Sequence, residues 1–80
     1  MTLSDRLEPG KMHISIASPP DRENVVAEIF FGHEQWAELN TEGNTVNLEL
    51  YPQRSGEPWT FNYEEALAAI QEAHRRLMDG

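Results

Sequence analysis

The sequence has 80 residues and no cysteine. Without thiols, neither a disulfide nor a thiolate metal site can supplement the hydrophobic core. The longest apolar run is far shorter than the roughly 20 residues of a membrane-spanning helix, and residues 1–10 lack the basic start and apolar run of a signal peptide. These absences predict one small domain located in the cytoplasm.

Basic residues are also scarce, with 6 Lys and Arg against 14 Asp and Glu, which gives a formal net charge of −8. Proteins bind phosphate backbones by neutralising them with Lys and Arg, so this composition disfavours nucleic acid and anionic membranes as partners. A strongly acidic surface keeps a small protein in solution. It also suits a protein partner with a basic surface, such as a toxin or nucleic-acid-binding protein held in check.

Alternating apolar and polar residues predict an antiparallel sheet, which residues 24–51 dominate. Residues 1–10 show no periodicity and are predicted to form a flexible tail, followed by a single domain over residues 11–80. The predicted strands are residues 11–18, 25–31, 35–39 and 46–50.

The first hairpin is predicted to turn through a three-residue loop at residues 32–34, where Gly32 supplies the conformational freedom that a tight turn needs. This register places Phe30 opposite Trp36. A two-residue loop would slip the pairing by one and set apolar against charged residues on both faces. The preferred register also places Glu28 opposite Glu38, a like-charge pair that costs stability.

The second hairpin is predicted to turn at residues 42–43. Leu39 then lies opposite Val46, and Ala37 lies opposite Leu48. Both hairpins together place one continuous apolar set on the core face of the sheet.

A helix is predicted over residues 62–78. Asn62 is a favourable N-cap, and Glu65 stands three residues later, as in a capping box. Before the helix, at least one of Trp59 and Phe61 is expected to cover the open end between sheet and helix, because such apolar side chains are rarely left in solvent. The apolar stripe of the helix consists of Tyr63, Ala66, Leu67, Ile70, Ala73, His74 and Leu77.

The polar residues form no motif of catalysis or metal binding. The three histidines match no metal-ligand spacing, so no metal and no cofactor is predicted. No serine has a histidine or lysine beside it in the sequence that would activate it as a nucleophile. The alternative of a small enzyme or ligand-binding domain would use His33, His74 or Arg54.

The second face of the predicted sheet carries Val26, Phe30, Trp36 and Tyr51 among glutamates. One interpretation is that these side chains stabilise the sheet by cross-strand pairing. The functional interpretation is a contact surface for a partner protein or a second copy, because Trp and Tyr are favoured at interface centres. These four residues are the predicted partner-binding site, and no catalytic residue is predicted.

Several segments between residues 25 and 78 resemble short hypothetical bacterial proteins, a group without an established activity. The resemblance implies no catalytic residue. Its most specific part is the segment Tyr51-Pro52 followed by Gly56-Glu57-Pro58-Trp59-Thr60-Phe61.

The sequence therefore predicts an α+β fold, with a four-stranded antiparallel β-meander and one C-terminal helix packed on one face. The predicted function is that of a small acidic, non-enzymatic binding or regulatory protein, acting through protein–protein contacts alone or as a homodimer.

Overall fold

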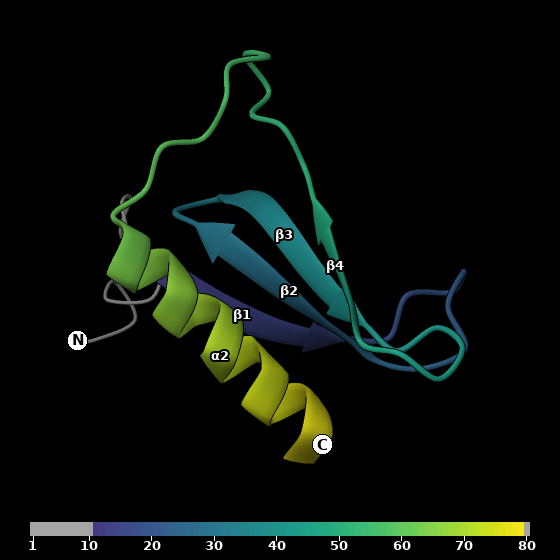
Figure 1. The fold of residues 1–80 in the computed structure, drawn as a ribbon. Coiled ribbons are helices and arrows are strands. Elements are labelled where there is room, and N and C mark those ends of the chain that lie inside the picture. Colours follow the sequence, from purple (N-terminus) through teal and green to yellow (C-terminus); the bar gives the residue numbers. More distant parts are fainter. Residues whose placement is uncertain (1–10, 80) are drawn as a thin grey trace, which may run out of the picture.

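A computed structural model describes residues 11–79 and confirms the predicted α+β fold (Figure 1). One open antiparallel sheet has the strand order β1-β2-β3-β4, and helix α2 packs on it. The predicted tail, residues 1–10, lies outside the described residues. The elements are β1 (Met12–Ala17), β2 (Val26–Phe31), β3 (Glu34–Asn40), β4 (Asn47–Leu50) and α2 (Tyr63–Asp79).

The first hairpin differs from the predicted register at its closed end. β2 and β3 pair as predicted from Ala27 to Ile29, so Glu28 does lie opposite Glu38. Beyond Ile29 the register shifts, and Phe30 faces Gln35 instead of Trp36. The turn has two residues, and the extra residue in β3 is a β-bulge at Trp36 that restores the predicted register further along the strand.

The bulge sends Trp36 to the face covered by α2, which we call the helix-side face. Trp36 is 4% exposed there, and its ring centroid lies 4.7 Å from that of Phe61. Phe61 and Trp59 are both partly buried and pack against the core.

The second hairpin pairs two residues further along than predicted. Leu39 faces Leu48, where Val46 was expected, and the pairs continue to Asn40 opposite Asn47. Within this longer connection, the Asn47 amide donates to Asn40 Oδ1 at 3.1 Å and to the Glu42 carbonyl at 3.4 Å. A shift of two residues leaves every side chain on its predicted face.

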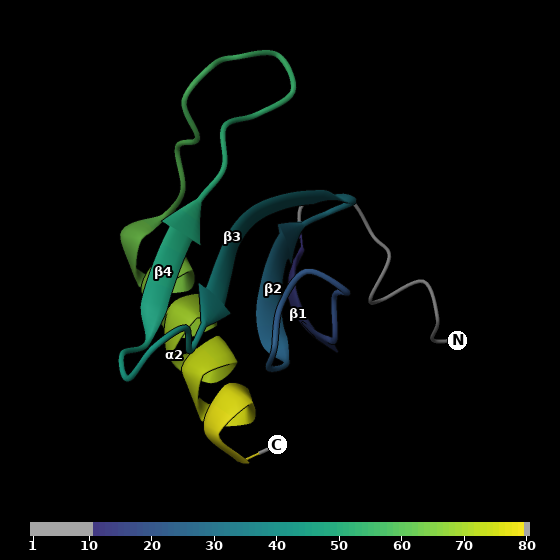
Figure 2. The ribbon, with the colours of Figure 1, turned by 90° about the vertical axis from the view of Figure 1, so that its right-hand side faces the viewer.

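Helix α2 begins at Tyr63, directly after the predicted N-cap residue Asn62. The Glu65 N–H donates to Asn62 Oδ1 at 3.0 Å, as expected for an N-cap. The helix packs mainly on β1 and β2, less on β3. Figure 2 shows α2 and the sheet from a second direction. Over residues 11–79, no helix is both long and apolar enough to cross a bilayer.

The buried core consists of Ala27, Ile29, Trp36, Ala37, Leu39, Ala69, Ala73 and Leu77.

Candidate functional site

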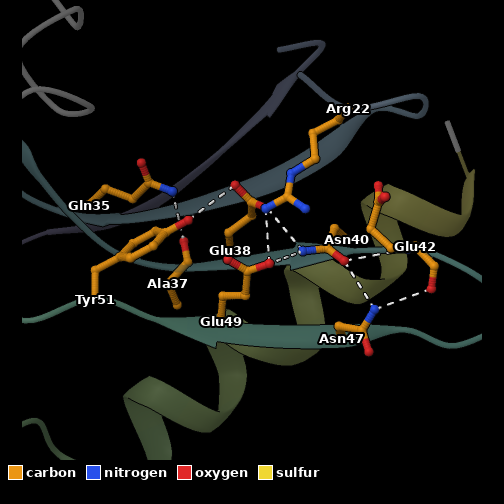
Figure 3. Close-up of polar contacts among 9 residues, drawn as sticks. All are labelled: Arg22, Gln35, Ala37, Glu38, Asn40, Glu42, Asn47, Glu49 and Tyr51. Atoms are coloured by element: carbon orange, nitrogen blue, oxygen red, sulfur yellow. Dashed lines mark hydrogen bonds and ion pairs between the residues drawn. The ribbon is translucent and has the colours of Figure 1, made fainter. Parts of the chain in front are cut away.

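The outer face of the sheet, opposite α2, carries a polar network (Figure 3). Arg22 Nη2 lies 2.9 Å from Glu38 Oε2 and 2.9 Å from Glu49 Oε2. The Asn40 amide donates to the same two oxygens at 3.0 and 2.7 Å. The Tyr51 hydroxyl donates to Glu38 Oε1 at 3.3 Å. One guanidinium from the β1–β2 connection thus holds two carboxylates from neighbouring strands.

The electrostatics of this face follow from these contacts. Burial, with the nearby charge of Glu38, raises the pKa of Glu28 above its ordinary value. Hydrogen bonds from Asn40 and Arg22 lower the pKa of Glu49. These contacts join the β1–β2 connection to β3 and β4.

The four predicted partner-binding residues do not lie together on one exposed face, and the predicted position of Trp36 on the outer face is wrong. Val26 is 0% exposed and Trp36 is 4% exposed, on opposite faces of the sheet. Phe30 is half-buried and stacks on His13, with ring centroids 4.8 Å apart. Tyr51 is half-buried beside the outer-face network. Whether Phe30 or Tyr51 contacts a partner stays a prediction.

The residues of the enzyme alternative are all exposed and come from three separate elements. His33 lies in the β2–β3 turn, Arg54 in the β4–α2 connection and His74 on α2. The Arg54 backbone N–H donates to Glu34 Oε2 at 2.6 Å, which ties this connection to the start of β3. Within residues 11–79, no cluster of three His, Cys, Asp or Glu side chains could hold a metal ion.

The helix-side face of β4 is uncovered. Leu48 and Leu50 lie opposite Leu39 and Ala37, so they project to the same face as these core residues. Leu39 is 4% exposed, whereas Leu48 is 44% and Leu50 is 66% exposed. The reason is the position of α2, which packs mainly on β1 and β2 and less on β3.

The flank of α2 that faces away from β1 is also apolar. Arg76 Nη1 donates to the Ile14 carbonyl in β1 at 3.3 Å, which fixes the orientation of the helix. Leu67 lies roughly 180° from Arg76 around the helix axis, and Tyr63 lies one turn before Leu67. Tyr63 is 75% and Leu67 is 38% exposed. We call Leu48, Leu50, Tyr63 and Leu67 the open strip.

An apolar cavity of about 400 Å³ adjoins the open strip at Leu50. It lies where the β4–α2 connection, which arches beyond the sheet in Figure 1, returns toward the helix. The Trp59 indole N–H closes this connection by donating to the Tyr51 carbonyl at 3.0 Å. The cavity is lined by Trp36, Leu50, Tyr51, Pro52, Pro58, Trp59 and Phe61.

Sequence reasoning missed the open strip because it assumed that α2 covers the whole sheet. A helix is about 10 Å wide and strands lie about 4.8 Å apart, so one helix covers roughly two strands. The alternation that ends at Leu48 and Leu50 predicted their face correctly. Element widths alone would have shown that one helix cannot cover all four strands of the sheet.

Comparisons with family models, with curated proteins and with solved structures give no match to this chain. The resemblance to short bacterial proteins therefore stays a prediction. The site is described by its geometry alone: an open, apolar edge of an α+β sheet beside an apolar cavity.

Proposed function

We propose that this chain is a small, acidic, non-enzymatic binding protein that acts through protein–protein contacts at the open strip. The observation that carries the proposal is the exposure of Leu48 and Leu50 on the face that elsewhere forms the core. Exposed apolar side chains beside an unpaired strand edge are typical of interaction sites. The adjoining cavity would receive an apolar side chain of the partner.

The proposed partner is a protein or a second copy of this chain. A net charge of −8 opposes phosphate backbones and anionic membranes, so neither is proposed. The proposal places the protein in the cytoplasm, as its composition predicts. The small-enzyme alternative is not adopted, because His33, His74 and Arg54 do not line the apolar cavity.

The experiment that tests this proposal is site-specific photo-crosslinking in cells that express the full chain. A photoreactive phenylalanine analogue replaces Leu50 in one variant. In the control variant it replaces Ser15, an exposed residue of β1 on the outer face. We expect a discrete protein adduct with the probe at Leu50 and none with the probe at Ser15. The absence of an adduct at Leu50, or equal adducts at both positions, would contradict the proposal.

A further inference from the structure

β4 is an edge strand, and one hydrogen bond shows which of its backbone groups face away from β3. The Tyr51 N–H donates to the Trp36 carbonyl in β3 at 2.9 Å. Backbone groups of an antiparallel strand alternate in direction, so Glu49 and Asn47 also turn toward β3. Leu48 and Leu50 therefore turn their N–H and C=O groups toward the open edge. Such an edge can accept another strand.

Pro52 limits the length of this edge. It occupies the next position that would turn outward, and proline has no backbone N–H to donate. The outward-turning residues available for pairing are thus Leu48, Leu50 and Val46, which immediately precedes β4. Three consecutive outward positions define a short pairing site with one centre, at Leu48.

We propose that the occupant of this edge is a second copy of the same chain, paired antiparallel through β4. With Leu48 at the two-fold axis, Leu48 lies opposite itself and Val46 lies opposite Leu50 of the second copy. All outward-turning groups from Val46 to Leu50 are then used. This inference rests on the proposed function and names the partner of the same strip.

The side chains agree with this register on both faces. Apolar residues oppose one another on the helix-side face, whereas Asn47 opposes Glu49 on the outer face, so that no two carboxylates lie directly opposite each other. A register centred on Glu49 would oppose two carboxylates and place Val46 against Pro52. A register centred on Asn47 would place Leu50 against Asn44, a residue of the β3–β4 connection. Only the Leu48-centred register avoids both conflicts.

The product is one continuous antiparallel sheet with the two α2 helices on the same face. A two-fold axis perpendicular to the sheet keeps the helix-side faces of both copies together. Leu50 is 66% exposed in the single chain, and Val46 of the second copy would lie beside it at the mouth of the apolar cavity. The dimer would thus cover the most exposed leucine of the open strip.

Sedimentation equilibrium of the full chain tests the assembly. We expect a reversible monomer–dimer equilibrium for the wild type. Leu48→Lys should abolish the dimer, because it places two ammonium groups at the axis. Met78→Lys is the matched control: Met78 is also an exposed apolar residue, at 52%, but belongs to α2, and its variant should dimerise like the wild type. Circular dichroism would confirm that both variants are folded.

Engineered cysteines test the register, since the chain has no cysteine of its own. Leu48→Cys should form an intermolecular disulfide on mild oxidation. Leu50→Cys alone should not, because its Cα would lie roughly 14 Å from its symmetry mate, beyond the 7 Å that a disulfide can bridge. A mixture of Val46→Cys and Leu50→Cys chains should crosslink.

Three outcomes would overturn the second-copy proposal: a wild type that stays monomeric at all concentrations, a dimer that survives Leu48→Lys, or disulfides from Leu50→Cys alone. The photo-crosslinking experiment at Leu50 shows whether only the second-copy proposal fails or whether the proposed function fails as well. An adduct with a different protein would retain the proposed function and reject the second copy. No adduct at all would reject both.

Discussion

Glu38 lies directly opposite Glu49 on neighbouring strands, and a single guanidinium, that of Arg22, contacts both carboxylates. Like charges directly opposite one another destabilise a sheet. The Glu38 side chain is only 8% exposed, so water screens it little. Arg22 therefore has a structural role: it links the β1–β2 connection to β3 and to the edge strand β4.

We predict that Arg22→Gln lowers the urea midpoint of unfolding, because it leaves two carboxylates facing each other without their cation. Arg54→Gln is the matched control, since Arg54 is exposed and has no salt bridge among the described residues. In a Glu49→Gln background, the Arg22→Gln change should lower the midpoint less. Equal losses in both backgrounds would show that Arg22 acts independently of Glu49.

Glu28 should have the opposite effect on stability. Burial and the charge of Glu38 raise its pKa, so the folded protein binds this proton more tightly than the unfolded chain. Ionised Glu28 therefore destabilises the fold as the pH rises through its raised pKa, and the effect is absent below its ordinary value. We predict that Glu28→Gln raises the free energy of unfolding at pH 7 by up to about 1 kcal/mol.

The measurement for Glu28 is urea unfolding of both proteins from acidic to neutral pH. The gain from Glu28→Gln should disappear in acid, where the wild-type carboxyl is protonated in both states. Glu23→Gln, in the exposed β1–β2 connection, serves as the control and should change little at any pH. A gain of the same size at every pH would point to a cause other than charge.

Glu72 provides the second pH-dependent prediction, and its sign is opposite to that for Glu28. Hydrogen bonds from Arg75 and Arg76 lower its pKa from the ordinary 4.5 to about 2. Its contribution to stability is therefore complete above pH 4.5 and is lost as the pH falls toward 2. Glu72→Gln should be less stable than the wild type at neutral pH, and the two should converge near pH 2.

Thermal unfolding followed by circular dichroism checks the Glu72 prediction. Glu57→Gln, an exposed change in the β4–α2 connection, is the control for the loss of one negative charge. The ion pairs of Glu72 lie on the surface of α2, so added salt should shrink the difference. A difference that persists at pH 2 would mean that the side chain acts through packing.

The alternation of apolar residues was sufficient to predict the fold class, because period-two patterning fixes which face each strand buries. It could not predict the bulge at Trp36. The adjacent apolar residues Trp36 and Ala37 interrupt the alternation of β3, but this interruption does not show which of the two belongs to the outer face or whether a bulge is present. The two-residue turn at Gly32 and the bulge compensate each other, and the pairing from Ala27 to Ile29 is the same with or without both.

The candidate site was less predictable than the fold, because it depends on where the helix lies across the sheet. Arg22 lies in a connection without periodicity, and nothing in its neighbours indicates that it reaches Glu38. Leu67 belongs to the same sequence stripe as Leu77, yet the first is 38% exposed and the second 7%. Periodicity gives the direction of a side chain, and only the placement of neighbouring elements decides its burial.

The last prediction uses this contrast between two leucines on one helix. Leu77→Ala should cost about 2–5 kcal/mol, because it opens a cavity against the core. Leu67→Ala should cost about 1 kcal/mol or less, because much of this side chain is already in solvent. Both changes replace leucine by alanine within α2, so helix propensity contributes equally to the two. Chemical denaturation of the two variants gives the comparison directly. Equal losses would mean that α2 is rotated or shifted toward β4, and the open strip would then be part of the core.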